Sequence, residues 1–400
     1  MHVCFFSIGH HGEAAGGGAE SYINTMAHAL TEIGHKVSVI ALSKENAQSY
    51  DGQVRIVQSA VKNRHWYLYR GLPFGKSFAQ PVREIEWSRC AWSALSQLNR
   101  EDPVDLVETG EIMTLQQLAG GKRPPVVIRG HGNTISIKRF CGERIGLGDR
   151  LGRKLQIAGM KRASAITAVS RFQAKELIRD LALPEDAVHV IPNPLSPGLA
   201  RQAFGTTRSE SGKPGVLYTG RIEANKGSLE LLRSVKHVAS RIPDVEYFFA
   251  GARHNSIDDR TLEGALGVNG TRAHVSLLGH VPWQKLADWY RRATVFAMPS
   301  FYETFGISVI EAMAFGLPVV ATKAGGLPEV VEDGVTGILV PPGDSQALAE
   351  ALACLLSDPE MRRRMGRAGQ ERVRAEFTVD RVIDRTLAVY ESVMCQNGKR

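Results

Sequence analysis

Short apolar runs alternate with longer amphipathic stretches along the first half of the chain. Six of these runs have the length and composition of buried parallel strands: 2–8, 36–42, 105–108, 125–130, 165–170 and 188–192. Apolar residues between the first two runs recur at helical spacing, and Gly34 stands where that helix would end. The pattern predicts repeated strand–helix–strand units, which are typical of a doubly wound parallel sheet.

A second series of strand and helix signals begins after a break in the pattern. The break, residues 195–214, is rich in proline, serine and glycine and predicts a linker. Six more strand runs follow it: 215–220, 245–251, 274–279, 294–300, 318–322 and 337–342. The fold class expected is α/β, with two doubly wound Rossmann-like domains, 1–195 and 196–377, facing each other across a cleft. We expect the last helical segment, 378–400, to cross back to the first domain, and capping of the second domain is the alternative.

Length and composition agree with a folded two-domain chain. With 400 residues, 43% hydrophobic and 22% charged, the chain is too long for one ordinary α/β domain and lies in the globular range. Its five cysteines are odd in number and far apart, which argues against a disulfide framework and against structural zinc. Neither a basic and apolar leader nor a run approaching 18 apolar residues is present. We therefore expect a cytoplasmic protein, with peripheral association at the inner face of the membrane as an addition.

The net charge of +8 favours an anionic partner. Nucleotide diphosphates and anionic membranes are attracted by the same field, so the charge does not choose between them, and we expect no nucleic-acid partner. Basic residues gather between 138 and 162, where eight lysines and arginines stand against Glu143 and Asp149. This segment is interpreted as either a solvated helix face or a peripheral contact with an anionic membrane.

A glycine-rich turn, Gly16 to Gly18, lies between the first strand and the first helix. Glycines there let backbone N–H groups approach an anion at the helix N-terminus, although a bare turn has the same composition. A nicotinamide dehydrogenase would need an acidic residue at the end of the second strand, where the sequence has ALSKEN. The dinucleotide interpretation is therefore disfavoured.

Two cations and two carboxylates follow strands of the second domain. Arg221 and Lys226, in GRIEANKG, could neutralise a diphosphate without metal, or could belong to an ordinary surface turn. Glu303 follows the strand at 294–300, and Glu311 lies on the helix after it. Carboxylates in the loop and on the helix could accept hydrogen bonds from two vicinal diols. The alternative makes Glu303 a partner of the helix dipole and Glu311 a solvated acid.

The residues around these carboxylates resemble the retaining glycosyltransferases of GT-B fold, family 4 (group 1), which include phosphatidylinositol mannosyltransferases. Glu303 and Glu311 match the E-x7-E signature of that family, and AGGLPEVVEDGVTGILVPPGD at 324–344 matches the stretch that follows it. The resemblance is dense over 215–345 and thin but consistent over 1–195. It implies a metal-independent enzyme, in agreement with the absence of a D-x-D motif from the sequence.

This resemblance also assigns roles to residues. The first domain would be the acceptor side and the second would bind the donor. Glu303 would hold the transferred sugar, Glu311 the ribose, and His131, in RGHG, would face the sugar, so that His131 and Glu303 are the catalytic candidates. The further donor-binding residues implied are Gly17, Gly18, Arg221, Lys226, Val281, Phe305, Gly306 and Ile307.

The reaction implied is transfer of a hexose-type sugar from a UDP- or GDP-sugar to a hydroxyl acceptor, with retention at the anomeric carbon. The nucleotide sugar is a co-substrate, and no cofactor is expected. The acceptor is either lipid-linked or a small molecule, in glycan, glycolipid or glycoside biosynthesis. Two segments depart from the family, AGARHN at 250–255 and IPNPL at 191–195, and the first puts the donor in question. A sugar-nucleotide epimerase and a catalytically inactive binding module remain alternatives.

Overall fold

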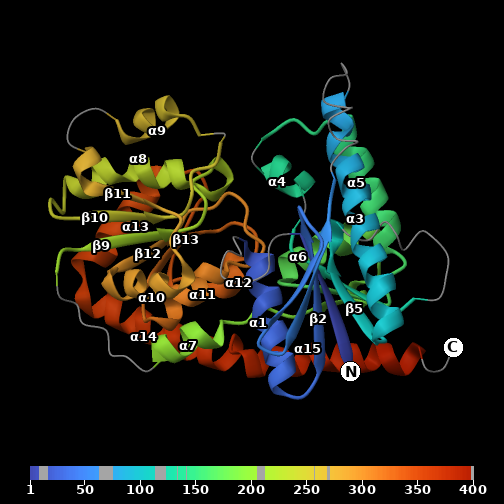
Figure 1. Cartoon of the computed structure of the whole chain (residues 1–400). Coiled ribbons are helices and arrows are strands. Elements are labelled where there is room, and N and C mark those ends of the chain that lie inside the picture. Colours follow the sequence, from blue (N-terminus) through green and yellow to red (C-terminus); the bar gives the residue numbers. More distant parts are fainter. Residues whose placement is uncertain are drawn as a thin grey trace. The chain divides into compact units, whose positions relative to one another are not determined.

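The computed structural model divides the chain into two compact units, Met1–Pro194 with Val379–Arg400, and Leu195–Thr378 (Figure 1). Leu195, expected in the first domain, begins the second unit because its amide donates to the Phe377 carbonyl oxygen at 2.7 Å. The residues described are 1–8, 17–62, 75–112, 123–132, 134–140, 142–204, 212–255, 257–267 and 271–397. Gly16 of the predicted glycine-rich turn lies outside them.

The first unit is built on an eight-stranded sheet of order β3-β4-β2-β1-β5-β6-β7-β8. Its strands are β1 His2–Ser7, β2 Lys36–Ser43, β3 Ala47–Asp51, β4 Val54–Ala60, β5 Leu106–Gly110, β6 Val126–Gly130, β7 Ala165–Ala168 and β8 Val188–Val190. All pairs are parallel except β3 with β4. Sequence analysis missed β3 and β4 because β3 is a largely exposed edge strand and β4 alternates instead of forming a continuous apolar run.

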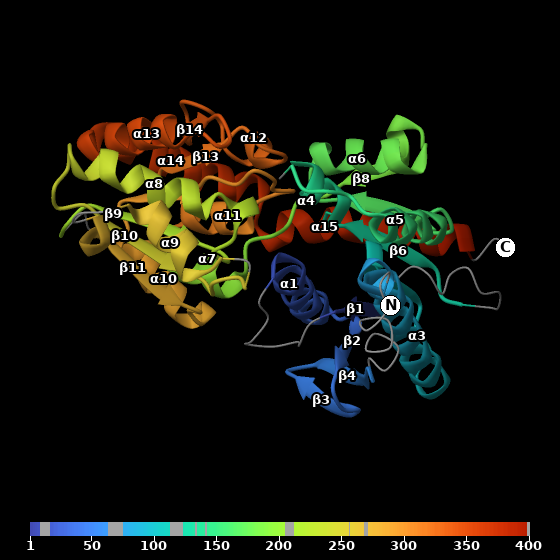
Figure 2. The same ribbon diagram turned by 90° about the horizontal axis from the view of Figure 1, so that it is seen from above.

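Helices cover both faces of this sheet (Figures 1 and 2). They are α1 Gly18–Glu32, α3 Gly75–Glu101, α4 Thr134–Phe140, α5 Leu147–Met160, α6 Arg171–Leu181 and α15 Val379–Asn397. Side chains of β1 alternate between two cores, with Phe6 facing α3, α5 and α6 and Phe5 facing α1 and α15. The helix end predicted at Gly34 is confirmed, since Gly34 has φ of +88° there. The C-terminal helix therefore returns to the first unit, as expected.

A six-stranded parallel sheet of order β11-β10-β9-β12-β13-β14 forms the centre of the second unit. The strands are β9 Gly215–Thr219, β10 Glu246–Ala250, β11 Val275–Gly279, β12 Val295–Met298, β13 Val319–Thr322 and β14 Gly337–Val340. The helices are α7 Pro197–Phe204, α8 Ser228–Ala239, α9 Asp259–Leu266, α10 Trp283–Arg292, α11 Ile307–Ala314, α12 Leu327–Val330, α13 Ser345–Ser357 and α14 Pro359–Glu376. The linker predicted over 195–214 is wrong in its first part, because α7 packs there with Leu199 and Ala203 buried.

The strand order of each sheet reverses direction at one point. In the second unit this switch lies between β9 and β12, and in the first it lies between β1 and β5. Ligands of open α/β sheets bind beyond the carboxyl ends of the strands at such points. Within the part of the chain that the structure describes, none of the helices has the length and apolar character needed to cross a bilayer.

Candidate functional site

Three loops meet beyond the carboxyl ends of β9, β12 and β13. Phe301 N–H donates to the Asn225 carbonyl oxygen at 2.9 Å, and Gly326 N–H donates to the Glu303 carbonyl oxygen at 2.8 Å. Gly227 has φ of +64°, and a Cβ there would overlap the Pro299 carbonyl. Only glycine fits so close to a neighbouring backbone in this conformation. The loops that carry the predicted cations and carboxylates are thus held against one another.

Lys226 and Glu303 form an ion pair in the middle of these loops. The Lys226 Nζ lies 2.7 Å from Glu303 Oε2, although the two residues are 77 positions apart. Their side chains are only 25% and 14% exposed. An anion and a hydroxyl arriving here would meet a cation and a carboxylate already fixed in position, which gives a polar ligand a prepared site.

Arg221, five positions before Lys226 in the loop after β9, presents its guanidinium to solvent. Its side chain is 57% exposed, and its Nη2 lies 3.1 Å from Glu223 Oε1. The Tyr218 hydroxyl donates to the Arg221 carbonyl oxygen at 2.6 Å, which fixes the backbone at the end of β9. The remaining donors of the guanidinium suit a phosphate.

The helix α11 begins at the same loops. Gly306 has φ of +100° and precedes the first helical residue, Ile307, while Phe305 is buried edge-on against Phe377. N–H groups at the start of a helix have no partner within that helix and favour an anion. The predicted backbone contacts of Phe305, Gly306 and Ile307 therefore lie at a site with the required polarity.

Glu311 is partly buried on the second turn of α11. The Tyr290 hydroxyl donates to Glu311 Oε2 at 2.7 Å and lies 3.2 Å from the Thr219 hydroxyl. Burial raises the pKa of Glu311 to about 7, and the hydrogen bond from Tyr290 lowers it in part. Sequence analysis predicted Glu311 but missed Tyr290 and Thr219, for which the sequence carries no recognisable signal.

Val281 lies apart from the paired charges. It follows β11, which β10 separates from β9 in the sheet. The divergent loop at 250–255 is tied to the β9 turn, since the Ile222 N–H donates to the Ala252 carbonyl oxygen at 3.0 Å. Arg253 in that loop is paired with Asp259. The structure therefore brings Arg221, Lys226 and Glu303 into adjoining loops and leaves Val281 further along the sheet edge.

The predicted residues of the first unit lie beyond β1 and β6. Gly17 caps α1, Gly18 begins it, and the Glu20 carboxylate folds back to where a Cβ on Gly17 would lie. His131 follows β6 with its ring 5.5 Å from the Tyr22 ring. Burial and then the charge of Arg129 lower the pKa of His131 to about 3. At neutral pH this imidazole is therefore uncharged.

A cavity of about 220 Å³ opens beside His131, at the carboxyl ends of β1, β5 and β6. Its polar lining includes Glu108 and Arg129, which sequence analysis missed. The Tyr390 hydroxyl donates to Glu108 at 2.7 Å, and burial raises the pKa of Glu108. Arg129 donates at 3.0 Å to Asn193. The sequence signal that could have indicated Glu108 is its position at the end of the strand run DLVE, where a side chain is expected to be buried.

The basic segment 138–162 is only partly exposed, and Arg153 does not belong to its surface. Arg153 is buried between Glu111 and Asp180, with its Nη2 2.8 Å from the Asp180 carboxylate, because it lies on the inward side of α5. Lys138 pairs with Asp149 at 2.8 Å. The other basic residues of α4 and α5 are exposed.

Comparison with known proteins identifies the family. The model described as "Glycosyl transferases group 1" matches residues 201–372, and that described as "Glycosyltransferase Family 4" matches 16–198. The alpha-maltose-1-phosphate synthase of Mycolicibacterium smegmatis is 32% identical over 64% of this chain and 70% of that protein.

Two further similarities extend over nearly the whole chain. The D-inositol 3-phosphate glycosyltransferase of Xylanimonas cellulosilytica is 28% identical over 95% of this chain and 92% of that protein. The crystal structure of Anabaena HepE in complex with UDP-glucose has a TM-score of 0.69 and 20% identity, covering 98% of this chain and 99% of that chain. With two parallel-sheet units of this kind, the chain belongs to the group 1 glycosyltransferases of GT-B fold.

Proposed function

We propose that this glycosyltransferase moves a hexose-type sugar from a UDP- or GDP-sugar to a hydroxyl acceptor, with retention and without a metal ion. The observation that carries the proposal is the Lys226–Glu303 ion pair at the switch point between β9 and β12, with Arg221 in the same loop as Lys226. The structurally similar HepE was crystallised in complex with UDP-glucose, which supports a uridine donor.

In this proposal, charge stabilisation of the departing diphosphate comes from the protein. Arg221 and Lys226 bind the diphosphate together with the backbone N–H groups of Phe305, Gly306 and Ile307 at the start of α11. Lys226 changes partner from Glu303 to phosphate, and the released Glu303 accepts hydrogen bonds from the transferred sugar. The helix dipole adds to the positive field, so that the leaving group is neutralised without a divalent cation.

The remaining predicted contacts complete the proposed donor site. Glu311 accepts hydrogen bonds from the ribose, and the backbone of Val281 contacts the base. Gly17, Gly18 and His131 of the first unit serve the donor phosphate and sugar. Since the pKa of His131 is about 3, its neutral ring offers a hydrogen bond and carries no charge that would oppose an oxocarbenium-like state.

The chemical step proposed is substitution on one face of the sugar. The bond between the anomeric carbon and the phosphate oxygen breaks, and a bond from that carbon to the acceptor oxygen forms on the same face. The acceptor proton goes to the departing phosphate oxygen. Catalysis then depends on positioning and on charge stabilisation by residues already in place.

The test compares Lys226→Met with Lys285→Met, which removes an exposed lysine from α10 in the same unit. The donor is first chosen by thermal shift with UDP-, GDP- and ADP-sugars, since a ligand of the folded state raises the melting temperature. We expect Lys226→Met to lower turnover by about 100-fold and Lys285→Met to leave it unchanged. Equal rates for the two variants would refute the site.

Two further measurements test the reaction itself. NMR of the product should show the anomeric configuration of the donor, and excess EDTA should leave the rate unchanged. An inverted product would refute retention. Loss of activity in EDTA that Mg²⁺ restores would refute stabilisation by the two cations.

A further inference from the structure

The first part of helix α5 has polar residues on its buried side and leucines on its exposed side, unlike an ordinary helix of a globular domain. Its buried residues are Gly148, Gly152, Arg153, Gln156, Gly159 and Met160. Leu147 and Leu151 instead face solvent, with 75% and 41% of their surfaces exposed. Leucines at such spacing normally face the core. The way α5 packs therefore leaves these two leucines in contact with water.

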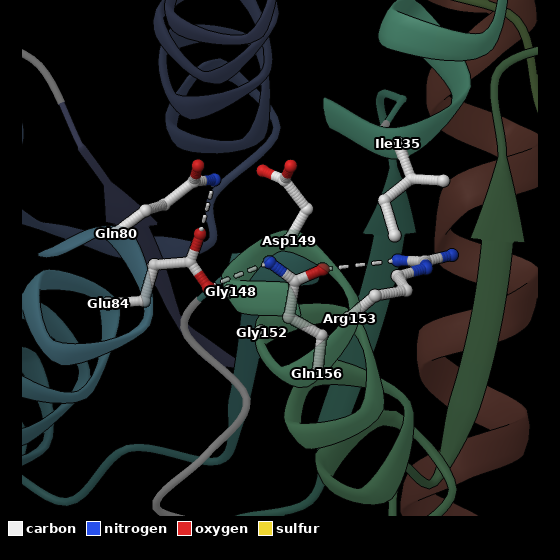
Figure 3. A pocket seen from close by; sticks show the side chains of 8 residues that line it. All are labelled: Gln80, Glu84, Ile135, Gly148, Asp149, Gly152, Arg153 and Gln156. Atoms are coloured by element: carbon white, nitrogen blue, oxygen red, sulfur yellow. Dashed lines mark hydrogen bonds between the residues drawn. The ribbon is translucent and has the colours of Figure 1, made fainter. Parts of the chain in front are cut away.

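A network of buried polar side chains fixes this orientation (Figure 3). The Gln156 amide donates to Glu84 on α3 at 2.9 Å, and Arg153 donates to Gln156 at 3.2 Å. These residues surround a cavity of only about 10 Å³, which is too small for a side chain. A Cβ on Gly152 would lie 3.5 Å from Pro81 of α3, so the helices are in close contact. Rotating α5 to bury its leucines would break this network.

The outward face of α5 combines the two leucines with cations. Arg150 and Lys154 are exposed and lie on the same side of the helix as Leu147 and Leu151. We call these four residues the basic–leucine face. Phe140, at the end of α4, adds a ring that is 43% exposed.

Positive charge predominates around the basic–leucine face. Arg139, Arg144 and Lys161 are also exposed, and Glu143 is the exposed acid among them. In the described ranges of the chain, none of the cations of the basic–leucine face takes part in an ion pair, whereas Lys138 is paired with Asp149. This surface therefore keeps its positive charge available for an anionic partner.

We propose that the basic–leucine face binds an anionic lipid bilayer, with Leu147 and Leu151 entering the interface and the cations contacting headgroup phosphates. Exposed leucines interleaved with lysine and arginine are typical of helices that lie in a membrane interface. A second copy of this chain would bring like charges face to face, and a soluble polyanion would leave the leucines in water. The inference does not depend on the proposed function, because these residues are separate from the donor site.

Sedimentation of the full chain with vesicles tests the proposal. The vesicles contain phosphatidylglycerol with phosphatidylcholine, or phosphatidylcholine alone. We expect binding to the anionic vesicles, weakened by high salt, and little binding to the neutral ones. Arg150→Gln with Lys154→Gln should weaken partitioning about 30-fold, since each cation near an anionic surface contributes about fivefold. Arg364→Gln with Arg367→Gln, an exposed pair on α14, is the matched control and should have little effect.

Leu147→Ser with Leu151→Ser separates a bilayer from other anionic partners. These side chains are exposed, so the double variant should keep the wild-type melting temperature while losing vesicle binding by at least about tenfold. Retention of full binding by the leucine variant would mean that the face is an electrostatic polyanion site and would overturn the membrane assignment. Failure of the wild-type chain to bind anionic vesicles, or equal binding to neutral ones, would overturn it as well.

Discussion

Ionisation of Glu311 should make both the stability of the second unit and its affinity for a nucleotide sugar depend on pH. Burial raises the pKa of this carboxyl from 4.5 to about 7. A raised folded-state pKa means that the protonated form favours folding. The resulting stability is fully present below about pH 4.5 and is lost as the pH rises through 7. At about 1.4 kcal/mol for each pKa unit, ionisation in the folded state costs about 3 kcal/mol.

Glu311→Gln removes that cost, because an amide of the same shape cannot ionise. We expect the variant and the wild type to melt at similar temperatures at pH 5. Above pH 8 the variant should melt roughly 6–12 °C higher, since about 1 kcal/mol shifts the melting temperature of a unit this size by 2–4 °C. Calorimetry across this pH range gives the measurement, and Glu263→Gln, at an exposed position of α9, is the control. Parallel curves for wild type and Glu311→Gln would refute the raised pKa.

The same ionisation should appear in ligand binding. A carboxylate accepts hydrogen bonds from two ribose hydroxyls, which the protonated acid cannot do. The diphosphate of UDP-glucose stays ionised over this range, so the affinity of the wild type should fall about fivefold between pH 7 and pH 6. Tyr290→Phe removes the hydrogen bond that lowers the pKa of Glu311. In this variant the affinity for UDP-glucose should therefore begin to fall at a higher pH. If affinity is independent of pH, Glu311 does not contact the donor through its charge.

Two other substitutions test how the units are built. Gly227→Ala places a Cβ against the Pro299 carbonyl at a φ of +64°, and should destabilise the chain by at least about 2 kcal/mol in urea unfolding, whereas Gly264→Ala, with open space around it, should not. Arg153→Met removes the buried guanidinium that pairs with Glu111 and Asp180 and should cost about 3–5 kcal/mol. Arg150→Met on the exposed side of α5 should have almost no effect, and equal stabilities of the two variants would refute the burial of this ion pair.

Most of the fold could be predicted because parallel strands that are buried on both faces have continuous apolar sequences. GVLYT and VVIRG illustrate this rule, and both are buried strands. The edge strand β3 and the alternating strand β4 do not follow it, which explains why both were missed. Helix α7 was missed because its segment is short and lies among proline and glycine, which are typical of a linker.

The candidate site could be predicted in part, because cations and carboxylates placed directly after strands gather at one edge of a parallel sheet. Arg221, Lys226 and Glu303 were singled out by this position, and the family resemblance implied their roles. Their pairing could not be predicted, since Lys226 and Glu303 meet only through the order of β9 and β12 in the sheet. The contact of Tyr290 with Glu311 also depends on tertiary packing and leaves no periodic signal in the sequence.

The two carboxylates eight positions apart are held in different environments, and this difference supports separate roles for them. Glu303 is paired with a cation, whereas Glu311 is enclosed with a phenol and has a pKa of about 7. In the proposed reaction, the diphosphate takes Lys226 from Glu303, and the freed carboxylate gains the sugar hydroxyls in exchange. Breaking the ion pair is then offset by two new polar contacts, and both form only when phosphate and sugar arrive together. The ion pair would therefore favour a complete nucleotide sugar over either fragment alone.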